Sequence, residues 1–471
     1  MKLSKTDYLQ FLECPKSLWL MKNKPDLYPA SKSSPYEDKL AKEGYEVQKI
    51  VQDLVKHRHK TDKVSFEKPF STKSGLYAVA DIIVEKNSGE LDIYEVKSAS
   101  SVEKTHLFDA TFQSIAVKET GKKIDSIFIV HLNKEYVRGD ELEVDKMVTF
   151  SNVSNRVETL VKQTRNNIER ALRLIDQKKI SEEQCTCLLL SKSHHCQSFK
   201  YFNRNITIPS IYNLPRIHKN KIKKFVSESR FSLNSVEYDE VSERQQLVLK
   251  AAKDKTPVIN LEYIKKFYKR IKFPLFFLDY ETYSSAIPII KGAKPHAHLP
   301  FQFSVHKQMT PNSGIEHFEY LAESAELPEK FLSELEKVIG EKGTVISWHK
   351  SFENTRNKEM GDLFPEKKDF LLKLIKRTID LENIFKMGYV DINFMGSTSI
   401  KKVLPVIVPS LTYEGMAVAN GTDAMIAFAK MISLESKDKR KKLRNEMLEY
   451  CKLDTLAMVK IYEKIKKIFL A

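Results

Sequence analysis

Two acidic residues interrupt a strongly apolar run at the start of the C-terminal third of the chain. The sequence FPLFFLDYETY predicts a buried strand in which Asp279 and Glu281 are two residues apart and therefore leave the same face. Burying two like charges side by side is costly unless cations neutralise them. The pair therefore predicts a binding site for divalent cations.

Three further residues are suited to the same chemistry. Glu353 follows the β-rich run GTVISW, and Tyr450 and Asp454 stand four apart in a helical pattern, so that both project from one helix face. A third and a fourth acid, together with a phenol, are therefore available for the predicted cation site. For Asp279 and Glu281 taken alone, a charged strand end is the alternative.

A second group of such residues lies on a predicted β-hairpin in the N-terminal half. The β-rich runs LYAVADIIVE and LDIYEVKS flank the turn signal at 86–90, which places Asp81 opposite Glu95. Glu95 and Lys97 share a strand face, so all three side chains converge. Two metal-binding carboxylates and a lysine that steadies developing charge suit phosphodiester hydrolysis. A charged face of a surface hairpin is the alternative.

The cysteines form a third group. The chain has five, an odd number, and no secretory signal, so a disulfide framework is not expected. One lies near the N-terminus and three follow the hairpin region, and together these four thiols are Cys14, Cys185, Cys187 and Cys196. Four thiolates suit a [4Fe–4S] cluster or zinc. His194 and His195 offer a different zinc site beside Cys196, buried free thiols are a further alternative, and Cys451 is expected only to pack.

The elements that must position these residues indicate an α/β protein with more than one domain. A chain of 471 residues exceeds what one core usually organises. Helical patterns up to about residue 60, the hairpin, a helix near 105–119, a strand at 125–133 and a helix at 154–176 predict α/β architecture. The pattern changes predict three parts, at 1–210, 211–272 and 273–471.

The segment 211–272 is mainly basic and helical, and we interpret it as a connector or an arm that faces nucleic acid; a solvated helix surface is the alternative. Further on, Gly396–Pro405 carries Lys401 and Lys402 beside small residues. This segment could approach a backbone phosphate, although a plain turn accounts for it equally well.

The overall charge favours a polyanionic partner. Lys and Arg outnumber Asp and Glu by 78 to 62, which gives a formal net charge of +16, and nucleic acid is the expected partner. Lysine-rich composition is the alternative explanation. The apolar runs are too short to span a bilayer and the first ten residues lack a signal-peptide pattern, so we expect no membrane association and a cytoplasmic location.

The N-terminal residues resemble those of the PD-(D/E)XK nucleases, in the RecB-like and CRISPR-associated branch. Asp81 matches the aspartate of the motif, EVK at 95–97 matches its E-x-K, and Gln113 in DATFQSIAVKETG matches the downstream helix glutamine. The resemblance covers roughly residues 1–205 and implies a restriction-endonuclease-like fold that binds Mg²⁺ or Mn²⁺ and cuts DNA.

That branch often has an iron–sulfur cluster held by one cysteine before the nuclease segment and three after it. This chain departs from the usual spacing in two respects. A single residue separates Cys185 from Cys187, and no cysteine stands near Asn203.

The C-terminal residues resemble the DEDD 3′–5′ exonucleases of RNase H-like fold, in the subtype whose third motif is Tyr-x-x-x-Asp. The first motif matches Asp279 and Glu281, and the third matches Tyr450 and Asp454. The second matches Glu353, where the family usually has Asp. Asp380 is the alternative acid and better resembles a supporting position. The resemblance implies a mixed sheet, two metals, and a water that Tyr450 orients.

Taken whole, the chain resembles a bacterial family of two-nuclease proteins, most clearly in FLDYET, GSTSIKKVLP and YCKLDTLAM. We therefore expect a nuclease that uses Mg²⁺ or Mn²⁺ at two sites. The alternatives are an exonuclease that trims RNA and a nucleic-acid-binding scaffold in which one site is vestigial.

Overall fold

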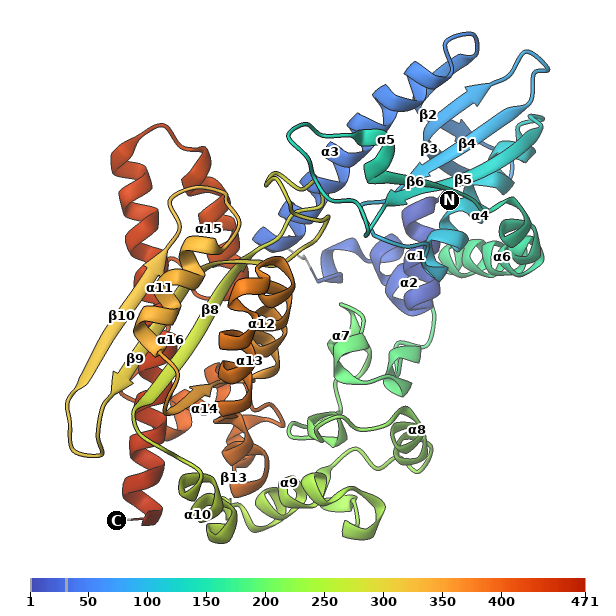
Figure 1. Ribbon diagram of the computed structural model, residues 1–471. Helices are drawn as coiled ribbons and strands as arrows, with labels where there is room; N and C mark the ends of the chain where they lie inside the picture. Colours follow the sequence, from blue (N-terminus) through green and yellow to red (C-terminus); the bar gives the residue numbers. More distant parts are fainter. Residues whose placement is uncertain (1, 30–32, 471) are drawn as a thin grey trace. The chain divides into compact units, whose positions relative to one another are not determined.

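The computed structural model describes residues 2–29 and 33–470 and divides into two compact units (Figure 1). The N-terminal unit contains the chain up to Asn205 together with Ser285–His296. The C-terminal unit contains Ile206–Ser284 and the chain from Ala297 onward. Both combine helices with mixed sheets, as the α/β prediction requires.

The N-terminal unit has one mixed sheet flanked by helices. Its strands are β1 (Leu3–Ser4), β2 (Lys63–Ser71), β3 (Leu76–Glu85), β4 (Leu91–Val96), β5 (Ile124–Leu132) and β6 (Val148–Asn152). Its helices are α1 (Lys5–Glu13), α2 (Pro15–Asn23), α3 (Pro35–Arg58), α4 (Lys104–Glu119), α5 (Val144–Met147), α6 (Ser154–Asp176) and α7 (Phe199–Phe202). The sheet order is β1-β3-β4-β5-β6, and β2 pairs with β3.

The predicted hairpin is formed by β3 and β4. Ile82 pairs with Tyr94 and Ile83 with Ile93, and the turn closes where the amide of Lys86 donates to the carbonyl of Glu90 at 2.9 Å. Side chains alternate between the two sheet faces. The face of Ile83 and Ile93, which packs with Val117 of α4, therefore also receives Asp81 and Glu95.

The C-terminal unit is built on a five-stranded mixed sheet. Its strands are β7 (Val258–Ile259), β8 (Leu275–Tyr283), β9 (Leu299–Gln308), β10 (Ile315–Leu321), β11 (Thr344–Ser347), β12 (Thr378–Asp380) and β13 (Tyr389–Val390). Its helices are α8 (Lys219–Ser227), α9 (Glu243–Asp254), α10 (Leu261–Lys269), α11 (Glu329–Ile339), α12 (Ser351–Leu363), α13 (Lys368–Arg377), α14 (Ile400–Ile407), α15 (Gly421–Ser433) and α16 (Lys437–Leu470). The main sheet has the order β10-β9-β8-β11-β12, and β7 and β13 form a separate pair.

Strand β8 is central and covered on both faces, which explains its continuous apolar sequence. Leu275 and Phe277 pack with residues of α14 and α16, whereas Phe276 and Leu278 pack with residues of α11 and α13. Each such side chain contributes about 1.5–3 kcal/mol when fully buried. The alternation continues past residue 278, so Asp279 leaves the sheet on the face of α16, where it contacts Cys451.

The division between the units differs from the sequence-based boundaries in two places. The basic segment 211–272 groups with the C-terminal unit, where β7 pairs with β13. The loop Ser285–His296, which follows β8 in sequence, groups with the N-terminal unit, where Arg138 donates to the carbonyl of Pro288 at 2.9 Å.

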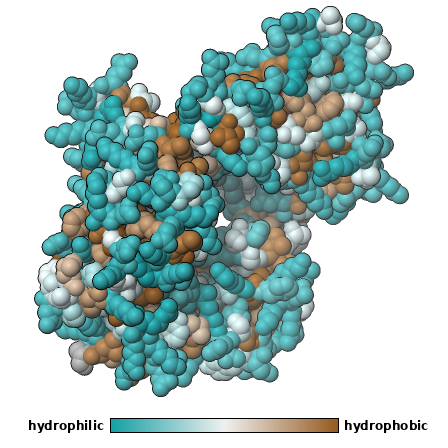
Figure 2. Space-filling model, viewed as in Figure 1, coloured by the Kyte–Doolittle hydropathy of each residue, from teal (hydrophilic) through white to brown (hydrophobic). Residues whose placement is uncertain are grey.

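Most of the surface that Figure 2 shows is hydrophilic, which fits a chain with 30% charged residues. Within residues 2–29 and 33–470, none of the helices has both the length and the apolar character needed to cross a membrane.

Candidate metal-binding sites

The C-terminal acids gather between β8 and α16. The ligand atoms of Asp279, Glu281 and Cys451 all lie within 4.8 Å of one another. The Cys451 thiol donates to Oδ2 of Asp279 at 3.7 Å, and Asp454 lies one helical turn further along α16, on the same side as Tyr450. Strand spacing and helix spacing therefore bring the first and third predicted motifs to one place.

Burial and the charges of neighbouring acids raise the pKa values of these acids when no cation is bound. Burial and the neighbouring charge of Asp454 raise the pKa of Asp279 well above its ordinary value. Burial and the charge of Asp279 do the same to the pKa of Glu281. Burial raises the pKa of Asp454 to about 6, although a hydrogen bond from Tyr413 opposes this shift. Such a group of buried oxygen ligands suits a divalent cation.

Glu353 joins this group from the connection that follows β11. It lies in the first turn of helix α12 and is 2% exposed. Burial and the charge of Asp279 raise its pKa well above the ordinary value. Its Oε2 has no hydrogen-bond partner among the residues that the structure describes. This buried oxygen is therefore available to a ligand.

Asp380 has a supporting position. Its Oδ1 accepts hydrogen bonds from the backbone amides of His349 at 3.0 Å and Glu382 at 3.1 Å. These bonds fix the connection between β11 and α12, which carries Glu353.

Two residues near the acids had no assigned place in the predicted site. The Tyr413 hydroxyl donates to Oδ1 of Asp454 at 2.6 Å, and no sequence pattern pointed to it. Lys401 lies over the rings of Tyr413 and Tyr450, at 5.6 and 5.7 Å from their centroids. Its positive charge lowers the pKa values of Asp279, Glu281 and Asp454.

Tyr450 keeps its proton. Burial raises the pKa of its hydroxyl, and the charges of Asp454, Glu281 and Asp279 raise it further. The phenol can therefore donate a hydrogen bond but cannot act as a base at neutral pH.

The N-terminal acids meet on the sheet face covered by α4. Oδ2 of Asp81 accepts a hydrogen bond from the backbone amide of Val96 at 2.8 Å, beside Glu95. Gln113 of α4 donates to Glu95 and to Oδ1 of Asp109, the second of these bonds at 3.0 Å. Asp109 is a further acid of this site. The helix spacing could have indicated it, because it stands one turn before Gln113.

Two lysines compensate these acids. Nζ of Lys97 lies 2.6 Å from Glu95 and 2.7 Å from Asp109, and Nζ of Lys5 lies 2.9 Å from Glu95. Burial alone would lower the pKa of Lys97, but Glu95 and Asp109 overcome it and raise this pKa well above its ordinary value.

The two lysines affect the acids unequally. Burial opposes ionisation of Glu95, yet Lys97 and Lys5 lower its pKa. Burial and the charge of Glu95 raise the pKa of Asp81 to about 7. Unlike the C-terminal group, this site is largely neutralised by its own side chains.

Four cysteines converge in the N-terminal unit. The Sγ atoms of Cys14, Cys185, Cys187 and Cys196 all lie within 4.8 Å of one another, and all four residues are buried. Asn203, where a cysteine was expected, donates from Nδ2 to Sγ of Cys185 at 3.4 Å. The thiols lie in an apolar cluster with Trp19 and Phe202. The arrangement has the number and softness of ligands that an iron–sulfur cluster or zinc requires.

The adjoining histidines lie outside this group of four sulfurs. Nδ1 of His194 lies 2.9 Å from the Ser191 hydroxyl. Nε2 of His195 lies 3.1 Å from the carbonyl of Leu190, and its ring stacks on Phe199. Neither histidine is needed to complete a four-ligand set.

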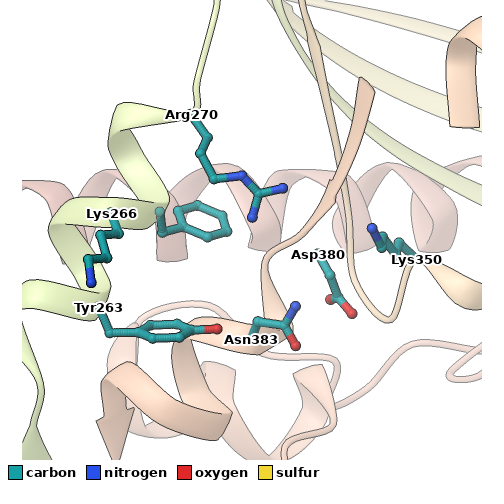
Figure 3. A pocket seen from close by; sticks show the side chains of 7 residues that line it. Tyr263, Lys266, Arg270, Lys350, Asp380 and Asn383 are labelled. Atoms are coloured by element: carbon teal, nitrogen blue, oxygen red, sulfur yellow. The ribbon is translucent and has the colours of Figure 1, made fainter. Parts of the chain in front are cut away.

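A small hollow of about 130 Å³ lies beside α10 (Figure 3). Tyr263 and Lys266 line it from α10, and Arg270 lines it from the residue after that helix. Lys350 follows β11 and Asp380 ends β12, and both also line it. The hydroxyl of Tyr263 points toward Asn383 (Figure 3). The hollow is basic and is separate from the acids of β8.

Comparison with known families finds a match in the C-terminal unit. Residues 276–399 match a family described as a domain of unknown function (DUF2779). The match includes Asp279, Glu281 and Glu353 and ends before Tyr450.

Two uncharacterized Mycoplasma proteins are similar in sequence. Protein MG366 of Mycoplasma genitalium is 25% identical over 219 residues, which cover 42% of this chain and 32% of that protein. Its homolog in Mycoplasma pneumoniae is 23% identical over 294 residues, which cover 56% of this chain and 41% of that protein. The chain thus spans less than half the length of these relatives.

Two solved structures show local likeness. The crystal structure of SSO0001 is 13% identical, with a TM-score of 0.25, over 41% of this chain and 87% of that one. The alkaline exonuclease LHK-Exo from Laribacter hongkongensis is 12% identical, with a TM-score of 0.24, over 37% of this chain and 91% of that one. Scores this low do not establish a shared fold.

Proposed function

We propose that the protein is a metal-dependent nuclease whose principal site is the C-terminal group of Asp279, Glu281, Glu353, Tyr450 and Asp454. The observation that carries this proposal is the burial of four carboxyl groups, which raises all four pKa values, and the negative charges of neighbouring acids raise three of them further. Divalent cations that bind to such a group of buried acids would stabilise the folded protein. By its resemblance to the DEDD enzymes, we assign this unit an RNase H-like fold and 3′–5′ exonuclease activity.

The residues present fit Mg²⁺ or Mn²⁺, because the candidate ligands are carboxylate oxygens and the buried Oε2 of Glu353 has no partner among the described residues. When bound, these ions would polarise the phosphate and lower the pKa of water. The protonated Tyr450 hydroxyl would donate a hydrogen bond that orients the water. In the reaction, the water oxygen bonds to phosphorus, the bond from phosphorus to the 3′ oxygen breaks, and the proton that the water loses balances the one that the leaving oxygen gains.

We propose a second nuclease site of PD-(D/E)XK type in the N-terminal unit, formed by Asp81, Glu95, Lys97 and Gln113. Asp109 would be a further ligand, and Lys5 a second cation near the phosphate. A metal ion would have to compete with the two lysines for Glu95 and Asp109. We therefore expect weaker metal binding here than at the C-terminal site.

The proposal is tested with the full chain and single strands of DNA and RNA that carry a label at the 5′ end. With Mg²⁺ or Mn²⁺, the wild type should shorten the labelled strand stepwise from its 3′ end. Asp279→Asn should remove this stepwise shortening, and Lys97→Ala should remove any internal cleavage that remains. The matched control is Asp362→Asn, because that carboxyl is 72% exposed and pairs with Lys368 on the surface.

Equal and slow degradation by the wild type and both variants would refute the proposal. Faster shortening of RNA than of DNA would identify the protein as an RNA-trimming exonuclease. A third outcome is that Asp279→Asn stops the shortening while Lys97→Ala changes none of the products. In that case only the C-terminal site cleaves, and the N-terminal site serves as a binding scaffold.

A further inference from the structure

A cavity of about 520 Å³ lies in the C-terminal unit, between the basic segment 211–272 and the strand ends of the sheet. Pro215, Arg216 and Arg244 line one side. The remaining lining comes from the residues after β11, from the turn that contains Glu382 and Lys386, and from the residues that lead into α14, as follows: Trp348, His349, Glu382, Lys386, Gly396, Ser397, Thr398, Ser399, Ile400 and Lys401. Cavities of about 300–1,000 Å³ are typical of sites for small molecules.

The charges on the wall of this cavity do not cancel. Glu382 is its one carboxylate, and that group is already bonded to Lys386, to the Thr398 hydroxyl and to Nδ1 of His349. Within the described residues, the guanidinium groups of Arg216 and Arg244 form no ion pair and no hydrogen bond, although the charge of Glu382 acts on Arg244 from the cavity wall. Two guanidinium groups therefore face the cavity without a bonded counter-charge, which is the arrangement that an anionic group would complete.

The cavity is held in shape by close contacts on both sides. Gly396 has φ +76°, and a Cβ atom there would lie 1.8 Å from the carbonyl oxygen of Asn213, so the two segments touch through their backbones. Nδ2 of Asn213 also donates to the carbonyl of Met395 at 2.9 Å, and Gln245 donates to the carbonyl of Pro215 at 2.9 Å. These contacts fix the arginine-bearing segment against the strand ends.

An aromatic residue in the cavity is also fixed. Nε1 of Trp348 donates to the carbonyl of Thr398 at 3.0 Å, and the indole stacks on Phe385. A rigid aromatic ring beside unpaired cations is the combination that single-stranded nucleic acids bind, with the ring contacting a base and the cations contacting the backbone.

Lys401 connects this cavity with the acids of the C-terminal site. It lines the cavity, and it lies over the ring of Tyr450. A strand whose scissile phosphate lies at Asp279 would thus have a neighbouring nucleotide within reach of the cavity.

We propose that this cavity binds the phosphodiester backbone of a single-stranded nucleic acid through Arg216 and Arg244, next to the C-terminal metal site. The inference rests on the proposed nuclease function and extends it by assigning the segment 211–272 a part in binding the substrate. A duplex does not fit, because a cavity of about 520 Å³ has the size of a small-molecule site.

The experiment measures binding in EDTA, so that no cleavage occurs. The anisotropy of a fluorescein-labelled 12-nucleotide oligothymidylate is followed as the full-length protein is added, at several KCl concentrations. The double variant Arg216→Gln/Arg244→Gln should weaken binding about tenfold or more. It should also reduce the slope of log Kd against log salt by about 0.7 for each phosphate that the arginines no longer neutralise. The matched control is Lys219→Gln/Lys223→Gln, which removes two exposed charges from α8 outside the cavity and should leave Kd within about twofold.

A second measurement does not depend on the arginines. The chain has two tryptophans, and the oligonucleotide should change the fluorescence of the wild type but not that of Trp348→Phe. Equal weakening in the double variant and the lysine control would overturn the proposal, as would equal weakening for the oligonucleotide and a 20-base-pair duplex. Thymidine monophosphate is also tested as a competitor of the oligonucleotide. If it competes with the same Kd in the wild type and in the double variant, the arginines do not bind phosphate and the proposal is overturned. A protein that binds as described but cleaves nothing with Mg²⁺ or Mn²⁺ would refute the nuclease function and leave the binding site intact.

Discussion

Substitution of Asp454 tests whether the C-terminal acids form a binding site for a cation. Its side chain is 7% exposed, and burial raises its pKa from the ordinary 3.8 to about 6. The folded protein therefore binds more protons than the unfolded chain between these two pH values. Stability falls wherever the folded state binds more protons and the pH rises. Without metal, this group should thus contribute no penalty below about pH 4 and its full penalty above about pH 6.

The size of the penalty follows from the two pKa values. Each pKa unit corresponds to about 1.4 kcal/mol, so the difference between 3.8 and about 6 amounts to about 3 kcal/mol at pH 8. Asp454→Asn removes the charge but keeps the size of the side chain and an acceptor for the Tyr413 hydroxyl. The metal-free variant should therefore be more stable than the metal-free wild type at pH 8, by up to about 3 kcal/mol, which is about 6 °C in Tm for a unit of this size.

The assay is thermal unfolding in EDTA at pH 4 and pH 8, followed by the same scans with Mg²⁺ or Mn²⁺. At pH 4 the two proteins should unfold at similar temperatures. At pH 8 the variant should unfold later in EDTA, whereas metal should raise the Tm of the wild type and have little effect on the variant. Asp362→Asn, which changes an exposed carboxyl, should follow the wild type throughout.

A lower Tm of Asp454→Asn than of the wild type in EDTA at pH 8 would refute the reasoning. In that case the ionised carboxylate would stabilise the fold through its own hydrogen bonds, and the acids would form a structural network without a need for cations. A difference of the same size at pH 4 and pH 8 would also contradict it, because the penalty would then not come from ionisation.

Three further substitutions probe the remaining parts of the two units. Glu353→Gln removes the charge of the second motif without changing its size, so the rate of 3′-end shortening should fall about 100-fold or more, and a rate near that of the wild type would exclude Glu353 as a ligand. Gly421→Val places a Cβ atom 3.0 Å from Oε2 of Glu281 and so crowds that carboxylate. Titration with Mn²⁺ should show weaker metal binding although no charge has changed. Unaltered binding would contradict a role of Glu281 as a ligand. Cys187→Ser removes one of the four clustered thiols, so elemental analysis of the purified protein should show less iron or zinc than in the wild type, whereas Cys451→Ser should keep the wild-type content. Equal metal content in all three proteins, or none, would mean that the thiols are structural.

Local spacing was enough to predict the parts of each site that lie on one element or one hairpin. Asp279 and Glu281 share a strand face because side chains alternate, and Asp81 and Glu95 meet because the hairpin turn fixes its own register. The structure has both arrangements. Gln113 also reaches Glu95 from α4, although the pattern gave only its place on a helix.

The sequence could not reveal residues that reach a site only through tertiary packing. Tyr413 bonds Asp454 across 41 positions of the chain, and Lys5 reaches Glu95 across 90. Neither position belongs to a periodic pattern that points to its partner. The same limit explains why the sequence of 211–272 predicts a connector or an arm that faces nucleic acid but not which residues it contacts, since the contact of Asn213 with Gly396 depends on how separate elements pack.

The repulsion between buried acids is compensated differently at the two sites. We therefore expect the two sites to depend on metal to different degrees. In the N-terminal unit, Lys5 and Lys97 supply two positive charges within 3 Å of Glu95, so most of the negative charge is compensated before any ion arrives. In the C-terminal unit, the nearby Lys401 donates a hydrogen bond to the carbonyl of Ala419 and lies over aromatic rings instead of bonding the acids. Stability should consequently respond to divalent cations mainly through the C-terminal unit, and the N-terminal site should require higher metal concentrations to act.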